Sequence, residues 1–535
     1  MPGYSIRARP ARGAAASPPA GSDPDVLAAF LEDAAHFPGG HAAGVVFPTT
    51  EAGVARAVRE ASTVLPIGAQ SSLTGGATPM GEIVLSTRQL NRRIDVADDS
   101  VRVGAGVTIA ELDSALADAG KCYPPAPTFT GAFVGGTVAT NAAGAATFKY
   151  GTTRDWVRAL TIVLANGDVL DVERGRVCAS DDGAFEIALS DRVARVDVPR
   201  YVMPRVAKLS AGYFAAPGMD LIDLFIGSEG TLGVVTEVTL RVLPSRPALC
   251  LAFVPFADRH AALTFVAELR RDAQDTWRTR DPQGLDISAI EHMDARCLAL
   301  LREDGVDRQH GVTIPDGTAI ALLVTLELPA DMTQARAFDE IGRARETGAP
   351  DTRLTRFCRA LDRAGVLDAV EIAVPGDRAR AEQLLAIREA VPAAVNARVG
   401  RAKHGVDAQI AKTAADMIVP FERLDELLKI YDDEFRRRGL DAAVWGHISD
   451  GNLHPNVIPR SIADVESGKD AILAFGREVR RLGGSPLAEH GVGRNGVKQQ
   501  LLRDLYGRDG IDQMRSVKRA LDPECKLAPG VIFPA

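Results

Sequence analysis

The stretch from Pro124 to Gly151, PPAPTFTGAFVGGTVATNAAGAATFKYG, places the strongest constraint on what this chain can fold into. Between Gly131 and Ala146 it has no charged side chain, but it contains four glycines and six alanines. A protein core would use Leu, Ile and Phe, whereas small residues allow the backbone to approach a non-protein group closely. Backbone N–H groups in such turns bind anions. We interpret the stretch as a cradle for a large phosphate-bearing cofactor, with a membrane span or a tightly packed Gly/Ala helix as the alternatives.

Composition limits the remaining choices. A chain of 535 residues is long enough for two or three domains, and its 46% hydrophobic and 25% charged residues are typical of globular proteins. The net charge of −8 gives no indication of nucleic acid or of an anionic membrane as a partner, and no apolar run is long enough for a transmembrane segment. The six cysteines contain no CxxC pair, which excludes a conventional iron–sulfur or zinc-ribbon motif and suits a reducing compartment.

Two further loops are rich in small residues. Residues 68–76, GAQSSLTGG, follow a short apolar strand, and residues 224–240 read as a strand, a glycine-rich turn and a second strand. The first loop lacks the Gly-Lys-Ser/Thr of a Walker A motif, and no helix opens directly from its glycines as the Rossmann motif requires. The two loops supply backbone donors without bulk, as the long stretch does.

Residues 246–484 alternate apolar runs of strand length with amphipathic stretches, which predicts an α+β layer. We expect strands at 249–254, 319–328 and 416–420, and helices at 258–270, 286–301, 332–346 and 421–438. Three isolated histidines are interpreted as ordinary surface or core residues: His260, His292 and His310.

A candidate reacting centre lies near the end of this region. In AVWGHISDGNLHPNVIP, residues 443–459, the Asp450-Gly451 turn predicts a hairpin that brings His447 and His454 together. Two imidazoles alone are weak evidence for a metal. Glu489, in SPLAEHGVGRNGVK, would complete a two-histidine, one-carboxylate set with open positions for substrate. The alternative is that Glu489 forms an ion pair with an arginine.

Taken together, these motifs resemble a known family. PIGAQSSLTGG, GGTVATNAAG followed by KYG, and GSEGTLGVVTEVTL resemble the flavin domain of the vanillyl-alcohol oxidase / p-cresol methylhydroxylase superfamily. HISDGNLH and AEHGVG resemble the HxGDGNLH and EHGxG motifs of its D-lactate, glycolate and D-2-hydroxyglutarate dehydrogenase branch, with Ser449 in place of the usual glycine. The closing DPECKLAPG resembles the family's DPxxxLNPG.

The resemblance implies an α+β fold with a two-subdomain FAD-binding domain, a cap domain for the substrate and a C-terminal segment that returns to the flavin domain. We expect a flexible tail at 1–22, the FAD-binding domain at 23–245, the cap with its metal-site hairpin at 246–484, and the returning segment at 485–535. FAD should be non-covalent, because the first loop has no histidine. The implied FAD contacts are Gly68, Ala69, Gln70, Ser71, Ser72, Pro127, Thr128, Gly131, Gly135, Gly136, Thr137, Asn141, Gly144, Tyr150, Gly151, Glu229, Gly233 and Val235.

The implied reaction is oxidation of a small D-2-hydroxy acid to the 2-oxo acid. His447, His454 and Glu489 would hold zinc or manganese, with ferrous iron chemically compatible, and His490 would take the hydroxyl proton. The candidate partners of the substrate carboxylate are Arg388, Lys412 and Lys208.

Electrons would pass to a separate acceptor: a quinone, a cytochrome or an electron-transfer flavoprotein. A homodimer is compatible with the sequence, and the expected location is the cytoplasm, with peripheral attachment to the inner membrane as the alternative. The same fold also supports other alcohol oxidations and a non-redox alkyl transfer of the alkylglycerone-phosphate synthase type.

Overall fold

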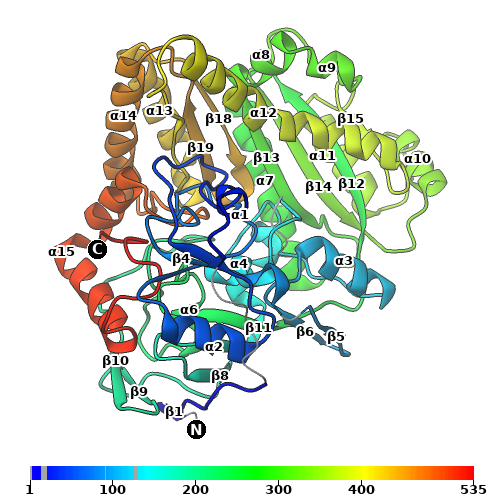
Figure 1. Ribbon diagram of the computed structural model, residues 1–535. Helices are drawn as coiled ribbons and strands as arrows, with labels where there is room; N and C mark the ends of the chain where they lie inside the picture. Colours follow the sequence, from blue (N-terminus) through cyan, green and yellow to red (C-terminus); the bar gives the residue numbers. More distant parts are fainter. Residues whose placement is uncertain (1–2, 14–20, 91, 126–128, 535) are drawn as a thin grey trace. The chain divides into compact units, whose positions relative to one another are not determined.

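The computed structural model describes residues 3–13, 21–90, 92–125 and 129–534. The chain divides into two compact units (Figure 1). The first unit comprises Met1–Gly144, Gly151–Pro244 and Ser485–Ala535, and the second comprises Ala145–Tyr150 and Ser245–Gly484. Both units mix helices with sheets, which confirms the predicted α+β class.

The described part of the first unit contains three sheets. A small parallel sheet has the order β2-β4-β3, an antiparallel sheet has the order β5-β6-β11-β7-β8, and a third has the order β1-β9-β10. The strands are β1 (Ser5–Arg7), β2 (Gly44–Val46), β3 (Val64–Ile67), β4 (Ile83–Ser86), β5 (Ile94–Val96), β6 (Ser100–Gly104), β7 (Val157–Val163), β8 (Val169–Glu173), β9 (Ala184–Ala188), β10 (Val193–Asp197) and β11 (Val234–Arg241). The helices are α1 (Pro24–Ala28), α2 (Glu51–Glu60), α3 (Ile109–Asp118), α4 (Val134–Ala139), α6 (Ile222–Phe225) and α15 (Gly496–Leu521).

Over its described residues, the long small-residue stretch forms helix α4 with the loops around it and, near its end, α5 (Thr147–Tyr150) of the second unit. A Cβ atom at Gly135 would lie 2.7 Å from the Cβ of Ala105, at the end of β6, so only glycine lets α4 pack at this distance. The N–H group of Gly135 donates to the Ala105 carbonyl at 3.0 Å, which fixes the contact. The stretch therefore allows one short helix to lie directly on the antiparallel sheet.

Described residues of the expected N-terminal tail contact the rest of the first unit. Strand β1 pairs in parallel with β9, and the guanidinium of Arg9 binds Glu51 and Asp171. Arg9 thus has acidic partners on α2 and β8. The flexible tail expected at 1–22 stays a prediction.

The second unit is built on one large sheet with the order β15-β12-β14-β13-β18-β19-β16, and β17 also pairs with β19. Its strands are β12 (Ala248–Phe256), β13 (Ile287–Asp294), β14 (Ile320–Leu328), β15 (Glu371–Ala373), β16 (Thr413–Ala414), β17 (Met417–Ile418), β18 (Ala442–His447) and β19 (Asn452–Val457). Its helices are α5 (Thr147–Tyr150), α7 (Arg259–Thr279), α8 (Ala295–Glu303), α9 (Val306–Gln309), α10 (Gln334–Gly342), α11 (Arg353–Arg363), α12 (Arg378–Gly405), α13 (Leu424–Arg438) and α14 (Ile462–Arg481).

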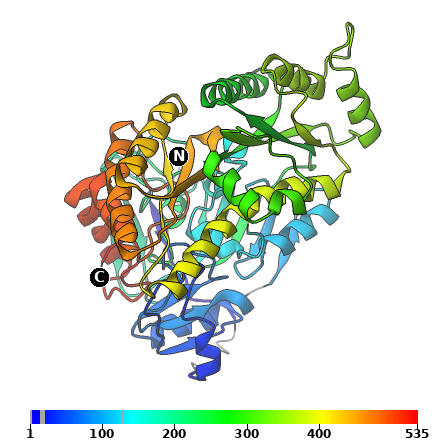
Figure 2. The same ribbon diagram turned by 90° about the horizontal axis from the view of Figure 1, so that it is seen from above.

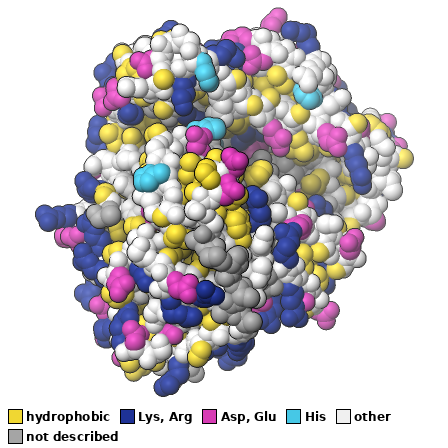
Figure 3. Space-filling view, viewed as in Figure 1, with side chains coloured by type: hydrophobic (Ala, Val, Ile, Leu, Met, Phe, Trp, Pro, Cys, Tyr) yellow, Lys and Arg dark blue, Asp and Glu magenta, His cyan; other side chains and the backbone are white. Residues whose placement is uncertain are grey.

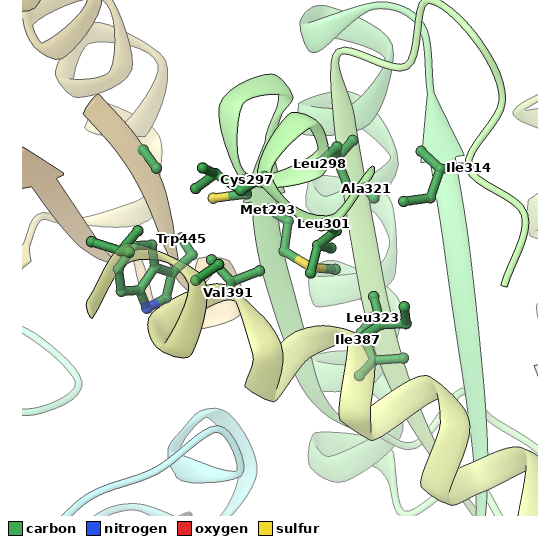
Figure 4. Close-up of a cluster of buried hydrophobic side chains, with 14 of the residues drawn as sticks. Met293, Cys297, Leu298, Leu301, Ile314, Ala321, Leu323, Ile387, Val391 and Trp445 are labelled. Atoms are coloured by element: carbon green, nitrogen blue, oxygen red, sulfur yellow. The ribbon is translucent and has the colours of Figure 1, made fainter. Parts of the chain in front are cut away.

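Helices cover both faces of this sheet. Seen from above, α7 lies on one side of the sheet and α12 on the other (Figure 2). Figure 4 shows Leu298 of α8 and Val391 of α12 packed with Met293, Leu323 and Trp445 of the sheet. On the opposite side, Phe256 of β12 contacts Phe265 of α7. Because strand residues alternate between faces, Glu291, Met293 and Trp445 all point toward α8 and α12.

The helix predicted at 286–301 is wrong in its first half. Residues 287–294 form β13 in the interior of the sheet, and α8 begins at Ala295 after Asp294, whose carboxylate caps it. Both faces of β13 are buried, so the strand lacks the apolar–polar alternation that would distinguish it from a helix.

Basic and acidic side chains are interspersed on the face shown in Figure 3, without a large area of one sign. Among the described helices, none combines the length and the apolar character needed to cross a bilayer.

The interior of the second unit contains a buried histidine that should make stability depend on pH. His292 has no exposed surface, and neither ring nitrogen has a hydrogen bond of normal geometry with the described residues, although the Val444 backbone lies near enough to favour the charged ring. Burial, aided by the charge of Arg259, lowers the pKa of His292 to about 3. The folded state therefore keeps the ring neutral, whereas the unfolded chain takes up a proton below a pKa of about 6.5.

We predict that wild-type stability falls as the pH drops from about 6.5 toward 3, and that His292→Leu removes this contribution. At pH 5 the His292 contribution is about 2 kcal/mol, from 1.5 pH units at about 1.4 kcal/mol each. Chemical unfolding of both proteins at pH 7 and pH 5 measures it. An unchanged pH dependence in the variant would contradict the assignment.

Candidate flavin and imidazole sites

The three small-residue segments lie together in the first unit. At the C-terminal end of α4, the carbonyls of Val138 and Ala139 accept the N–H groups of Gly227 and Glu229 at 3.0 and 2.7 Å. The loop after β3 lies against the N-terminal end of α4, because a Cβ at Gly68 would contact the Phe133 ring at 3.6 Å. Segments far apart in the sequence thus surround one short helix.

The two glycines of α4 have different surroundings. Gly135 packs against Ala105, whereas a Cβ at Gly136 would meet no described atom within 4 Å. Just after the helix, Asn141 adopts a positive φ of 47° and its Oδ1 accepts the Arg154 N–H at 2.9 Å. The helix backbone is therefore fixed by protein on one side and borders open space at Gly136, which fits a large ligand that lies close to the main chain.

Most of the predicted flavin contacts lie in these segments: Gly68, Ala69, Gln70, Ser71, Ser72, Gly131, Gly135, Gly136, Thr137, Asn141, Gly144, Gly151, Glu229, Gly233 and Val235. Pro127 and Thr128 lie outside the described residues.

Several of these positions have protein partners. The Gln70 amide donates to the Glu32 carbonyl at 2.8 Å, and a Cβ at Gly233 would lie 2.4 Å from Ile162. Tyr150 lies in the second unit, where its hydroxyl donates to Glu327 at 2.7 Å.

Glu229 holds the C-terminal segment in the first unit. Its carboxylate accepts the N–H groups of Val492 and Gly493, each at 2.8 Å. Burial raises the pKa of Glu229, and these two N–H groups oppose the shift. The glutamate of GSEG thereby fixes the backbone that follows Glu489 and His490.

Glu489 has charged and polar neighbours in the same unit. Its Oε2 lies 2.9 Å from the ammonium of Lys208, which is 2% exposed, and its Oε1 lies 3.5 Å from the His490 Nε2. The sequence predicted an arginine as the alternative partner of Glu489, but the partner is a buried lysine. Lys208 therefore contacts the predicted metal ligand.

The second unit contains the predicted hairpin, and it brings the two histidines together. Strands β18 and β19 pair through a turn at Ile448–Asp450, and Gly451 completes the turn with a φ of 81°. The rings of His447 and His454 lie 5.6 Å apart at an angle of 89°. This part of the prediction is confirmed, because the Asp450-Gly451 turn sets the register that pairs the strands.

A carboxylate lies near the Nδ1 atom of each imidazole, within hydrogen-bond distance at His447 and farther away at His454. Glu291 Oε1 lies 2.9 Å from the Nδ1 of His447, and Asp416 Oδ1 lies 3.5 Å from the Nδ1 of His454. Carboxylates in this position orient histidine ligands in metal sites, where the other ring nitrogen binds the metal. The donor set of the second unit therefore fits a divalent cation.

Sequence reasoning missed Glu291 and Asp416. Glu291 fell inside the stretch predicted as a helix, which hid its position opposite His447 on the neighbouring strand. For Asp416 the sequence predicts only the start of a strand. Its place between β16 and β17, which both pair with β19, is the feature that brings it to His454.

Arg388 and Lys412, also in the second unit, have different surroundings. The Nε of Arg388 donates to Glu291 Oε2 at 2.8 Å. Burial alone would raise the pKa of Glu291, but its interactions with Arg388 and His447 lower it to about 2. Lys412 keeps an exposed surface, although the surrounding protein desolvates its ammonium and lowers its pKa to about 8.

The predicted site residues thus form two groups. Lys208, Glu489 and His490 lie together in the first unit, and His447, His454 and Arg388 lie in the second. That Glu489 and the two histidines bind the same metal ion stays a prediction.

Two family models match this chain. A FAD binding domain matches residues 42–173, and the C-terminal domain of FAD linked oxidases matches residues 248–532, which is more than half of the sequence. The chain belongs to the FAD-linked oxidases. The prediction that it belongs to the vanillyl-alcohol oxidase / p-cresol methylhydroxylase superfamily is confirmed. The prediction that it is an FAD-dependent oxidoreductase is confirmed as well.

Relatives of this FAD-linked oxidase extend along most of its length. A D-2-hydroxyglutarate dehydrogenase of Xanthomonas citri pv. viticola is 30% identical over 487 residues, covering 89% of this chain and 84% of that protein. A D-lactate dehydrogenase of Anaerostipes hadrus is 27% identical and covers 88% of this chain and 84% of its own. The 4-ethylphenol oxidase from Gulosibacter chungangensis has the same fold, with a TM-score of 0.61, 17% identity, and coverage of 96% of this chain and 94% of its own.

The two hydrogen bonds that Glu229 accepts from the C-terminal segment lead to a prediction for this oxidase. Glu229→Ala leaves the Val492 and Gly493 N–H groups without their acceptor, and an unsatisfied buried donor costs about 1–3 kcal/mol. We expect amide hydrogen exchange in residues 489–494 to accelerate by about tenfold or more, because about 1.4 kcal/mol corresponds to a factor of ten. Glu229→Gln, which keeps one acceptor oxygen, should show a smaller effect. Equal exchange in all three proteins would contradict the role of Glu229.

Proposed function

We propose that this FAD-linked oxidase oxidises a D-2-hydroxy acid of the D-lactate, glycolate or D-2-hydroxyglutarate type to the 2-oxo acid. Relatives named D-2-hydroxyglutarate and D-lactate dehydrogenase support oxidation of a hydroxy acid in general. The observation that carries the proposal is the group in the second unit: two adjacent imidazoles, each with a carboxylate near Nδ1, next to a partly buried arginine. Oxidation of a simple aromatic alcohol does not require this combination of cation ligands and an anion-binding group.

His447, His454 and Glu489 are the proposed ligands of a divalent cation, zinc or manganese. The chemistry that the bound groups supply is hydride acceptance, by FAD, and acidification of the substrate hydroxyl, by the cation. The protein's part is to present two neutral imidazoles and one carboxylate, which leave coordination positions for substrate. The ammonium of Lys208 lies 2.9 Å from Oε2 of Glu489 and holds this carboxylate in place.

Arg388 is the proposed partner of the substrate carboxylate. Its Nε is engaged by Glu291, while its two Nη groups make no hydrogen bond with the described part of the chain. A guanidinium held in this way can donate two parallel hydrogen bonds to a carboxylate. Lys412 remains a second candidate, whereas Lys208 is occupied by Glu489.

His490 is the proposed base. Its Nε2 lies 3.5 Å from Glu489 Oε1, so a proton taken from a hydroxyl near Glu489 could be held on this ring beside a carboxylate. The Glu229 contacts fix the backbone next to His490 and so limit the positions that its ring can adopt.

The electron acceptor is proposed to be a separate quinone, cytochrome or electron-transfer flavoprotein, and the compartment to be the reducing cytoplasm. The structure forms no disulfide at Cys178, Cys250, Cys297, Cys358 and Cys525, as expected in that compartment.

Anaerobic mixing of the purified, FAD-loaded protein with substrate tests the proposal. D-lactate or D-2-hydroxyglutarate should bleach the oxidised flavin band, because hydride transfer reduces the flavin, and the L enantiomers should bleach it far more slowly. His490→Ala should keep its FAD but slow bleaching by about 10²–10⁴-fold, the usual effect of removing a positioned base.

His260→Ala, which changes an exposed histidine on α7, serves as the control and should bleach at the wild-type rate. Normal bleaching by His490→Ala would remove that residue from the mechanism. A wild-type flavin that no 2-hydroxy acid reduces would contradict the proposed function and favour a non-redox role.

A further inference from the structure

Glu291 is a buried carboxylate whose two oxygens have different partners. Oε1 lies 2.9 Å from the Nδ1 of His447, and Oε2 accepts the Nε–H of Arg388 at 2.8 Å. The three side chains come from β13, β18 and α12, so one carboxylate joins two neighbouring strands and the helix that covers them.

The bond to His447 determines which ring nitrogen can bind a cation. An ionised carboxylate only accepts hydrogen bonds, so the proton of a neutral His447 lies on Nδ1 and Nε2 keeps its lone pair. The bond to Arg388 acts similarly on the guanidinium. With Nε held, the plane of the group is set and its two Nη groups are left for another acceptor.

The sheet holds this arrangement before any ligand binds. Glu291 and His447 are direct partners in the antiparallel pairing of β13 and β18. The hydroxyl of Ser449 accepts the N–H of Ile290 at 3.2 Å and ties the turn of the hairpin to β13. Glu291 is therefore fixed by its backbone as well as by its two partners.

We propose that Glu291 is a positioning residue shared by two functions: it presents His447 to the divalent cation and Arg388 to the substrate carboxylate. The inference rests on the proposed function and goes beyond it, because it predicts that one substitution at a residue that touches neither ligand weakens the binding of both.

The second unit offers a matched control. Glu371 of β15 forms an ion pair with Arg380, which lies on α12 as Arg388 does. Glu371→Gln therefore removes a bond between a strand carboxylate and an α12 arginine in which no imidazole takes part. Arg388→Lys is the third variant, because it keeps a cation beside Glu291 but removes the planar pair of Nη donors.

Two binding measurements on the FAD-loaded proteins separate the functions. Cobalt(II) affinity is read from the visible absorption of the bound ion, and oxalate affinity is read from the change that it causes in the oxidised flavin spectrum at saturating cobalt. We expect Glu291→Gln to weaken cobalt binding by about 10–100-fold, the usual effect of removing a partner of a histidine ligand. We expect oxalate binding to weaken by about tenfold as well, because Arg388 loses its orientation.

The other variants should show a different pattern. Glu291→Ala should weaken cobalt binding more than Glu291→Gln, since the glutamine carbonyl can still accept the Nδ1–H of His447. Arg388→Lys should weaken oxalate binding and leave cobalt affinity within about threefold of the wild type. Glu371→Gln should change neither, and an unchanged near-UV circular dichroism spectrum confirms for every variant that the second unit is folded.

Wild-type affinities for both ligands in Glu291→Gln would overturn the inference. The same two losses in Glu371→Gln would also overturn it, because they would then follow from any loosening of α12. A wild-type protein that is reduced by a 2-hydroxy acid but binds no cobalt, zinc or manganese would refute the metal site and this inference with it, while leaving the oxidation itself in place.

Discussion

The contact of the Gly135 backbone with Ala105 is the constraint on which the first unit depends. It allows a helix of six residues to lie on the antiparallel sheet, and the carbonyls at the end of that helix then bind the turn that carries Glu229. Glu229 in turn fixes the segment that carries Glu489 and His490. The lack of a side chain at Gly135 thus controls the position of the polar groups that are proposed to react.

In the second unit, a charged group is buried between the large sheet and a helix that covers one of its faces. Burying a charge is costly unless it is paired and hydrogen-bonded, and Glu291 meets this condition with a guanidinium and an imidazole. Replacing such a group with apolar residues commonly has little cost for stability. Stability alone therefore does not account for the three ionisable side chains between β13, β18 and α12, whereas the proposed function does.

The sequence predicted those features that depend on local chemistry. The Asp450-Gly451 turn identified the hairpin of β18 and β19, and the glycines and alanines around residue 135 identified a place where the backbone is approached closely. Contacts between segments far apart in the sequence were harder to predict. Strand β13 has no polar face, so its sequence is also compatible with a helix, and the position of Glu291 opposite His447 could not be inferred. The Lys208–Glu489 pair joins residues 281 positions apart, and no local pattern predicts it.

X-ray absorption at the metal edge of the cobalt-loaded protein tests the central claim, that two imidazoles and a carboxylate bind a cation in this flavoenzyme. The account predicts nitrogen and oxygen neighbours only, with the outer-shell scattering of two imidazoles, and the loss of that signal in the His447→Ala, His454→Ala double variant. Sulfur in the first shell, or an imidazole signal that persists in the double variant, would contradict it.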